Sequence, residues 1–352
     1  MKRTILLISI SAMFLLGCFG SDSTGPSAFD RHGWIVGENS GDLLSILHTS
    51  DGSTWDHQGS TLSLPSASLG SVSAVDSTTA WAAGGISGGY GVVIRTVDGG
   101  ANWTRVGTAA DLPSATMCIT ALDANVAFVG GMDNTVSMTV DGGSSWQDIS
   151  DPAFDGNFWQ GIFALGMNDI WLSGGTTQDG LLLHTGNGGA DWTAHCDSLL
   201  QGYTMISIAA WDQDNVWAVG HGYTVVRTTD GGGSWAIVTP DSMHAQGNDA
   251  NGISLQGADD AWVVLDYGNL WRTTDGGDSW TFQDVPEGVK GYFLLRISAL
   301  DNNTAWVTGR SAYGTQEGVI LHTNDGGNNW VRQDEGNLPA LWGVSFAGDL
   351  PN

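Results

Sequence analysis

Acidic side chains recur in this chain at one fixed position of a short phrase, which reads RTTDGGDSW at residues 272–280 and HTNDGGNNW at residues 322–330. Carboxylates in a loop can bind calcium, but a calcium loop supplies several oxygen ligands, whereas each copy of this phrase offers one carboxylate. One copy carries asparagine, which keeps the hydrogen-bond acceptor and loses the charge. We therefore interpret the following residues as structural: Asp51, Asp98, Asp141, Asn187, Asp230, Asp275 and Asp325.

Other residue types could support other chemistry. Two carboxylates on either side of a glycosidic bond can act as acid and base, and Asp179 with Glu317 is one conceivable pair, although no spacing singles it out. The sequence has no H-x-H motif and no Cys/His cluster of the kind that binds zinc. His221, in GHGY, is interpreted as a loop residue. We therefore expect neither a metal nor a cofactor.

The acidic phrase belongs to a longer repeat that must position all of these residues. It occurs seven times, and its tryptophans lie 43 to 50 residues apart, a period typical of propellers and arrays. Each unit reads as strand A (RISALD, 296–301), strand B (TAWVTG, 304–309), strand C (GVILHT, 318–323) and strand D (WVRQD, 330–334). Alternation of apolar and small residues is typical of strands. We predict an all-β protein, a seven-bladed propeller of four-stranded antiparallel blades.

The two ends of the repeat support this count. The first unit begins at its strand B, RHGWIVGE (31–38), and lacks a strand A, while LWGVSFAGD (341–349) is a spare strand A with no strand B after it. We therefore expect the C-terminal strand to pair with the N-terminal unit and close the ring. In this arrangement the phrase is the C–D turn: the aspartate accepts hydrogen bonds from turn N–H groups, glycines supply positive φ angles, and the tryptophan packs between strands or against the next blade.

Antiparallel blades place the A–B and C–D turns on one face and the longer B–C and D–A loops on the other, where variable loops commonly bind partners. Tyrosine and tryptophan suit amphipathic partners such as peptides and sugars, but tyrosines are also simply tolerated in wet loops, and both interpretations stay open. The candidate binding residues on this B–C/D–A face are Tyr90, Trp159, Tyr203, Tyr223, Tyr267, Tyr292, Tyr313, Trp342, Arg310, Glu317 and Asp179.

The N-terminal residues indicate that the protein is targeted to a membrane. A basic start and an apolar run precede LLGC (15–18), as in a bacterial lipoprotein signal in which the cysteine is acylated. We predict a signal peptide over 1–17, a lipidated Cys18 with a tether over 18–29, and the propeller over 30–352. Phe19 rather than aspartate after the cysteine favours the outer membrane, facing either the periplasm or the cell surface. Cys118 and Cys196 are expected to be separate buried thiols.

The net charge narrows the class of partner. The formal charge is −26, and it becomes −28 when Lys2 and Arg3 are lost with the signal. Such a surface repels nucleic acid and anionic lipid. We therefore expect a protein or glycan partner and no nucleic acid.

The turn phrase resembles the Asp-box, or BNR, repeat, and the combination in NVWAVGHGYTVVRTTDGGGSW (215–235) resembles the photosystem II stability/assembly factor-like propellers. That resemblance implies a seven-bladed, non-enzymatic protein that acts by protein–protein contact during assembly of a membrane complex. Photosynthetic members present a basic arginine patch, whereas this chain has nine arginines, with two, Arg296 and Arg310, near the candidate face. We therefore do not extend the photosystem role to it.

Sialidases and xyloglucan-cleaving enzymes also carry similar repeats, which leaves a glycoside hydrolase as the alternative. A sialidase needs three arginines from different blades around the sugar carboxylate. Here Arg95, Arg227 and Arg272 precede C–D turns on the opposite face. The two arginines near the candidate face, Arg296 and Arg310, belong to one blade. The xyloglucan enzymes use two propellers, and this chain supplies one.

Overall fold

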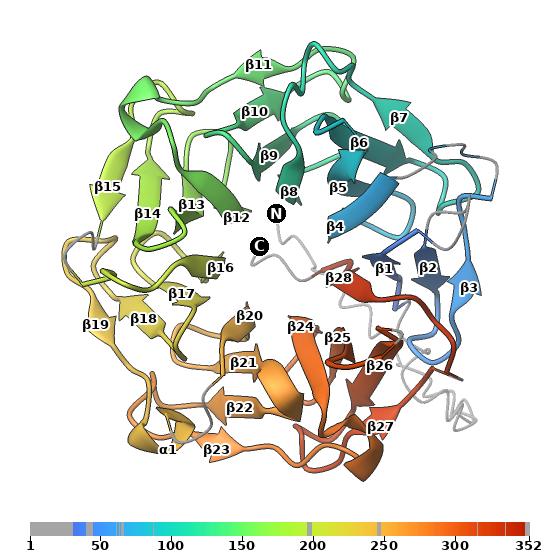
Figure 1. Ribbon diagram of the computed structural model, residues 1–352, viewed down its shortest axis with the longest axis vertical. Coiled ribbons are helices and arrows are strands. Elements are labelled where there is room, and N and C mark those ends of the chain that lie inside the picture. Colours follow the sequence, from blue (N-terminus) through green and yellow to red (C-terminus); the bar gives the residue numbers. More distant parts are fainter. Residues whose placement is uncertain are drawn as a thin grey trace, which may run out of the picture.

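Seven four-stranded antiparallel sheets surround a central axis in the computed structural model (Figure 1). The structure describes residues 31–348 apart from 40–44, 61, 63, 65–66, 87, 196–198, 245–247, 315 and 335. The predicted signal, Cys18, the tether and Cys196 therefore lie outside the described residues. Within the part that is described, no helix is long and apolar enough to span a membrane.

The strands run from the ring centre outward in the order A, B, C, D. Blade 1 contains β28 (Leu341–Phe346), β1 (Gly33–Gly37), β2 (Ile46–Thr49) and β3 (Asp56–His57). Blade 2 contains β4 (Ala67–Ala74), β5 (Ala80–Ile86), β6 (Gly91–Thr96) and β7 (Thr104–Val106). Blade 3 contains β8 (Thr116–Ala121), β9 (Ala127–Gly131), β10 (Val136–Thr139) and β11 (Gln147–Asp148). Blade 4 contains β12 (Phe158–Ala164), β13 (Ile170–Gly175), β14 (Gly180–Thr185) and β15 (Thr193–His195).

Blade 5 contains β16 (Met205–Ala210), β17 (Val216–Gly220), β18 (Val225–Thr228) and β19 (Ala236–Ile237). Blade 6 contains β20 (Ala250–Leu255), β21 (Ala261–Leu265), β22 (Leu270–Thr273) and β23 (Thr281–Phe282). Blade 7 contains β24 (Tyr292–Ala299), β25 (Ala305–Ser311), β26 (Gly318–Thr323) and β27 (Val331–Arg332). Short helical turns occupy the loops of the B–C/D–A face: η1 (Pro152–Phe154), α1 (Asp241–His244), η2 (Asp266–Gly268) and η3 (Glu287–Val289).

The ring closes as predicted. Strand β28 pairs with β1, and Ile35 lies opposite Val344. Phe346 anchors this closure, because its ring stacks on Trp306 of blade 7 with ring centroids 3.7 Å apart. The seven blades, the four strands in each and the closing pair confirm the fold that the repeat predicted.

The hydrophobic core lies between neighbouring blades. One cluster joins Trp34 and Val36 of blade 1 to Leu69 and Ala82 of blade 2, and comparable clusters follow around the ring. Six of the seven B strands contribute a fully buried tryptophan to this core. Burial of one such indole removes about 150–250 Å² from water, which corresponds to roughly 4–6 kcal/mol as an upper estimate.

The Asp-box turn is built around a buried threonine and an exposed aspartate. In blade 3 the Thr139 hydroxyl accepts the Gly143 N–H (2.9 Å), while Asp141 accepts the Ser145 N–H (2.9 Å). Both intervening glycines have positive φ angles, +73° and +83°. The Gly142 N–H also donates to the Asn125 carbonyl (3.0 Å), which ties the C–D turn to the A–B turn of the same blade and puts both on one face.

The box tryptophan packs against the preceding blade rather than the next one. The Trp192 indole N–H of blade 4 donates to the Ile149 carbonyl of blade 3 (2.8 Å), and Trp280 of blade 6 donates to Val238 of blade 5 (2.9 Å). The expectation of packing against the next blade was wrong, because each of these indoles reaches the carbonyl that follows strand D of the preceding blade. Each repeat therefore seals one inter-blade interface.

Serine side chains of the inner strands join some neighbouring blades directly. The Ser73, Ser254, Ser298 and Ser345 hydroxyls each accept a backbone N–H from the inner strand of the following blade, at 3.0 to 3.1 Å. Blades 3, 4 and 5 carry Thr120, Phe163 and Ala209 at this position. The serine bonds therefore concentrate around the closing blade, where the ring has no covalent connection between its first and last strands.

Candidate functional site

Every inner strand carries a β-bulge near the B–C/D–A face. The register between strands A and B shifts by one residue in each blade, for example between Thr116 and Cys118 in blade 3 and between Leu294 and Arg296 in blade 7. A bulge re-aims the extra residue and strengthens the local twist. The extra residues are Gly70, Met117, Gln160, Ile206, Asn251, Leu295 and Trp342.

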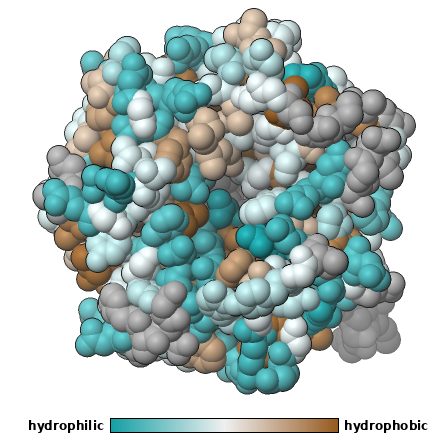
Figure 2. Space-filling model, in the orientation of Figure 1, coloured by the Kyte–Doolittle hydropathy of each residue, from teal (hydrophilic) through white to brown (hydrophobic). Residues whose placement is uncertain are grey.

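All seven extra residues line one hollow at the ring centre, which we call the funnel. It has a volume of about 350 Å³ and is also bordered by Thr116, His221 and Arg296. The space-filling view shows the surface hollowed at this centre (Figure 2). Because the seven bulge positions carry seven different side chains, the funnel has no rotational symmetry, unlike the scaffold that holds it.

Arg296 is the main charge at the funnel wall. Its Nη1 donates to the carbonyls of Asn251 (2.7 Å) and Leu295 (2.9 Å), so two bulge residues orient the guanidinium. Burial among the inner strands lowers the pKa of this arginine. Among the described residues no carboxylate forms an ion pair with Arg296, whereas Arg227, Arg272 and Arg332 are all paired with acids.

Arg310 extends this positive region toward the rim. Its guanidinium lies over the rings of Phe293 (4.8 Å to the ring centroid) and Trp342 (5.4 Å). Its Nε is buried and has no hydrogen-bond partner within the described structure. The nearby Asp266 carboxyl has a raised pKa, mainly because of burial. The funnel wall thus offers an anionic group Arg296, with Arg310 nearby toward the rim, in a partly dry setting where charge–charge attraction is stronger than in water.

The predicted tyrosines stand on the B–C/D–A face but outside the funnel. Tyr90, Tyr203, Tyr267 and Tyr313 expose between 38 and 77% of their surface. Tyr223 and Tyr292 are half-buried. Of the residues described at the funnel wall, none is a tyrosine. The structure therefore separates the aromatic rim from the charged centre, a division that the sequence did not indicate.

Three of the predicted site residues have other roles. Trp159 is fully buried, and its indole N–H donates to the Asn134 side chain (3.1 Å), so it cannot contact a partner. Glu317 accepts a hydrogen bond from Arg332 (2.7 Å), and Asp179 accepts the Gly202 N–H (3.0 Å). The last two acids directly precede β26 and β14, which lie on opposite sides of the ring (Figure 1). These two carboxylates are therefore not placed on either side of a single glycosidic bond.

The funnel wall could have been anticipated in part. Strand A contains one residue too many for strict alternation between core and channel, and that irregularity recurs in all seven units. The sequence did not show which residue would be displaced, because the bulge position depends on how strands A and B pair. Arg296 was noted near the face, but its lack of a carboxylate partner is visible only in three dimensions.

The remaining titratable candidates do not form a second charged site. Among the described residues there is no group of three or more His, Cys, Asp or Glu side chains that could hold a metal. His221 borders the funnel with Asp249 3.9 Å away. Cys118 is a free, buried thiol, as predicted, and burial raises its pKa to about 12. The thiol is therefore protonated and unreactive at neutral pH.

Comparison with known proteins gives a consistent picture. A family model described as "Photosynthesis system II assembly factor YCF48" matches residues 27–130 and 245–340, which together are more than half of the chain. The chain is 28% identical over 257 residues to the photosystem II assembly lipoprotein Ycf48 of Synechococcus sp. (strain CC9902), covering 60% of this chain and 72% of that protein.

Solved structures with low identity show the same fold. One is YCF48 bound to D1 peptide, with a TM-score of 0.64, 18% identity and coverage of 84% of this chain and 89% of that one. Another is the GH74 xyloglucanase from Xanthomonas campestris, with a TM-score of 0.63, 15% identity and coverage of 88% of this chain but 55% of that one. At these identities the likeness concerns the propeller alone.

Proposed function

Because the chain belongs to the family of photosynthesis system II assembly factors described as YCF48, we propose that it binds a partner protein through its B–C/D–A face, as an assembly or scaffold factor. The family consists of assembly factors, and the chain is not an enzyme. The one pair of acids considered for a hydrolase, Asp179 and Glu317, stands on opposite sides of the ring (Figure 1), and no hydrolytic role is proposed.

The observation that carries this proposal is Arg296 at the funnel wall, which has no carboxylate partner among the described residues. A charged guanidinium in a partly buried setting is costly unless an anion approaches it. The relative with a bound D1 peptide is a propeller of the same fold. We propose that this chain likewise receives a peptide segment of its partner, with an acidic group at Arg296 and Arg310. Exposed rings such as Tyr90, Tyr203 and Tyr313 would contact the surrounding surface of the partner.

The proposal includes a membrane anchor. The Synechococcus relative is named a lipoprotein, and LLGC at 15–18 supplies the matching cysteine. We propose that residues 1–17 are removed, that Cys18 is acylated, that 18–29 is the tether, and that the propeller stands at the outer membrane of a bacterial cell envelope. A Cys18→Ser variant should then move from the membrane fraction to the soluble fraction. Retention in the membrane fraction would contradict the anchor.

Site-specific photocrosslinking tests the partner site. A benzoylphenylalanine placed at Gln160, at the funnel wall, should capture one discrete envelope protein in cells. The same group at Ile237, which is half exposed on the outer strand of blade 5, is the matched control and should not. The adduct should disappear in Arg296→Gln and return in part in Arg296→Lys, which restores the charge.

Two outcomes would overturn this assignment. One is an adduct of equal yield from Ile237, and the other is an adduct from Gln160 that is unchanged by Arg296→Gln. Mass spectrometry of the captured protein would also identify the crosslinked segment. That segment should contain an aspartate, a glutamate or a chain-terminal carboxylate.

A further inference from the structure

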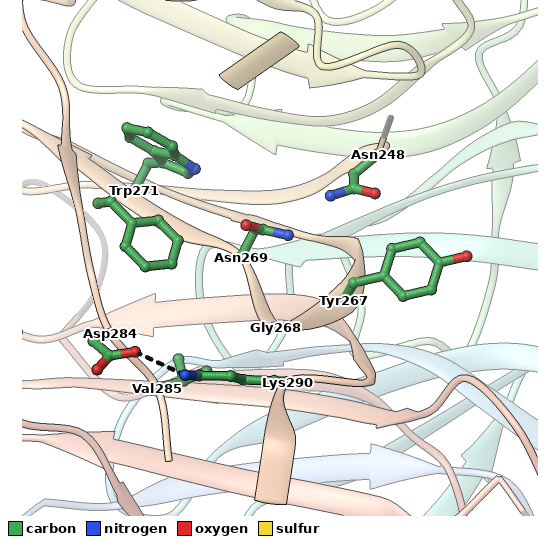
Figure 3. Close-up of a pocket in the computed structure, with 9 residues that line it drawn as sticks. Asn248, Tyr267, Gly268, Asn269, Trp271, Asp284, Val285 and Lys290 are labelled. Atoms are coloured by element: carbon green, nitrogen blue, oxygen red, sulfur yellow. Dashed lines mark ion pairs between the residues drawn. The ribbon is translucent and has the colours of Figure 1, made fainter. Parts of the chain in front are cut away.

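A second hollow lies on the flank of blade 6, where the turn and strand 267–271 face the loop 284–290 (Figure 3). We call it the flank groove. Its volume is about 650 Å³, within the range of about 300–1,000 Å³ that is typical of small-molecule sites. It shares no lining residue with the funnel.

Aromatic rings form one wall of the groove. Trp271 and Phe282 meet edge to face with ring centroids 5.3 Å apart. Blade 3 carries Ser137 at the position of Trp271, and the remaining blades carry an aliphatic residue such as Leu47 or Leu321. Phe282 and Tyr267 leave 45% and 40% of their surface exposed. Apolar rings at the edge of a cavity provide flat surfaces on which a ligand can stack.

The backbone holds Tyr267 in an unusual conformation. Its φ angle is +57°, a left-handed value that costs of order 1–3 kcal/mol for a residue with a Cβ. Asp133 of blade 3, a residue type that tolerates this region, stands at the corresponding position with a φ angle of +52°. The next residue, Gly268, lies so close to the 284–290 loop that a Cβ there would come within 2.9 Å of the Val289 carbonyl. The backbone of the tyrosine is therefore fixed beside the groove, and its ring meets Phe293 edge to face with ring centroids 5.2 Å apart.

The lysine that lines the groove is paired with acids, which outnumber it by one charge. Lys290 pairs with Glu287 (2.7 Å) and approaches Asp284 (3.7 Å). The Trp271 indole N–H is buried and has no hydrogen-bond partner in the described structure, and Figure 3 shows the indole bordering the same space as Asn248 and Asn269. The groove thus combines stacking surfaces with hydrogen-bonding groups and offers little to a free anion.

From this combination we propose that the flank groove binds a neutral carbohydrate. The apolar face of a sugar ring would stack on Phe282 and Tyr267, a sugar oxygen would accept the Trp271 N–H, and a hydroxyl would donate to the Asp284 carboxylate. Stacking on an aromatic ring together with hydrogen bonds at the ring edge is the chemistry that distinguishes a sugar from a purely apolar or charged ligand. No bond is made or broken.

Calorimetric titration of the full chain, in a detergent without a sugar headgroup, tests this proposal. The probes are cellotetraose, maltotetraose and chitotetraose, with tetragalacturonate as the charged comparison. At least one neutral tetrasaccharide should bind. Phe282→Ala and Tyr267→Gly should each lower its association constant by about tenfold or more. Glycine tolerates the positive φ angle, so Tyr267→Gly removes the ring without adding strain.

Tyr90→Ala removes a comparably exposed tyrosine from another blade and is the matched control, expected to leave sugar binding unchanged. Arg296→Gln should also leave it unchanged, so failure of the groove and failure of the funnel can be told apart. The proposal is overturned if none of the three neutral tetrasaccharides binds, or if binding survives both groove variants. It is also overturned if tetragalacturonate binds more tightly than all three.

Discussion

The Arg272 guanidinium lies over the Trp262 indole, with its Cζ 4.4 Å from the ring centroid, and donates to both carboxylate oxygens of Asp260 (2.8 and 3.2 Å). The two stacked residues are direct cross-strand partners on β21 and β22. This contact places a cation between an aromatic face and an acid, so the charge is satisfied inside the scaffold and is not available to a ligand.

The same pair position recurs in every blade. Trp34 carries His48, Trp81 carries Arg95, Trp171 carries His184, Trp217 carries Arg227 and Trp306 carries His322, and blade 3 pairs Phe128 with Met138. Three of the nine arginines are therefore part of the fold. These three arginines are thus committed to the scaffold, which leaves Arg296 and Arg310 as cations near the funnel.

Arg272→Lys should lower the free energy of unfolding by about 1–2 kcal/mol, because lysine keeps the charge but loses the planar stack and the two-pronged bond to Asp260. Urea denaturation followed by circular dichroism measures this. Arg105→Lys, on the outer strand of blade 2, is the control and should change stability by less than about 0.5 kcal/mol. Equal effects of the two substitutions would mean that the stack contributes nothing.

Stability should fall in two stages as the pH is lowered. Burial lowers the pKa of His322 to about 4 and also lowers those of His48 and His195. The unfolded chain therefore binds more protons than the folded chain between pH 6.5 and about 4, and stability present above pH 6.5 is lost through this window. Below about pH 4 the aspartates of the Asp-box turns cause the further loss of stability, since hydrogen bonds hold the pKa of Asp141 at about 2.

His322→Met tests the first stage, because blade 3 already uses methionine at this position. The urea midpoint of the wild type should fall between pH 7 and 5, and the variant should lose part of that fall while keeping the one below pH 4. A variant with an unchanged pH profile would show that His322 does not titrate in this range.

Thr139→Val should cost about 1–3 kcal/mol, because the isosteric side chain leaves the buried Gly143 N–H without its acceptor. Asp141→Asn should cost less, since Asn187 fills the same role in blade 4 and accepts the Asp191 N–H (3.0 Å). Thermal denaturation of the two variants shows which of them is less stable. If the asparagine variant were the less stable one, the charge of the box would matter more than its acceptor geometry.

Phe346→Ala should cost about 3–5 kcal/mol, because this fully buried ring stacks on Trp306 and meets Trp55 edge to face across the ring closure. Phe282→Ala, whose ring is half exposed, is the matched control and should have a much smaller effect. Limited proteolysis would locate the damage, with early cleavage expected near β28 and β1. Uniform cleavage around the ring would argue against a local closing role.

Sequence alone determined the scaffold of this protein. Seven copies of a phrase with a near-constant period, one missing strand A and one spare strand A define the blade number and the closure. The glycines and the acceptor of the box define the turn. These features depend on contacts within one unit or on strict repetition, so the order of residues is enough to predict them.

The tertiary structure determined which side chains the propeller places in the funnel. Trp159 and Trp342 begin equivalent inner strands, yet one is buried against Asn134 and the other is displaced into the funnel. The bulge in each blade, and not the alternation of residues, determines which side chain faces the channel. Likewise Arg272 and Arg296 carry the same charge, but only the second lacks a carboxylate partner among the described residues. Whether an arginine has a carboxylate partner depends on residues far apart in the sequence, so only the folded ring reveals it.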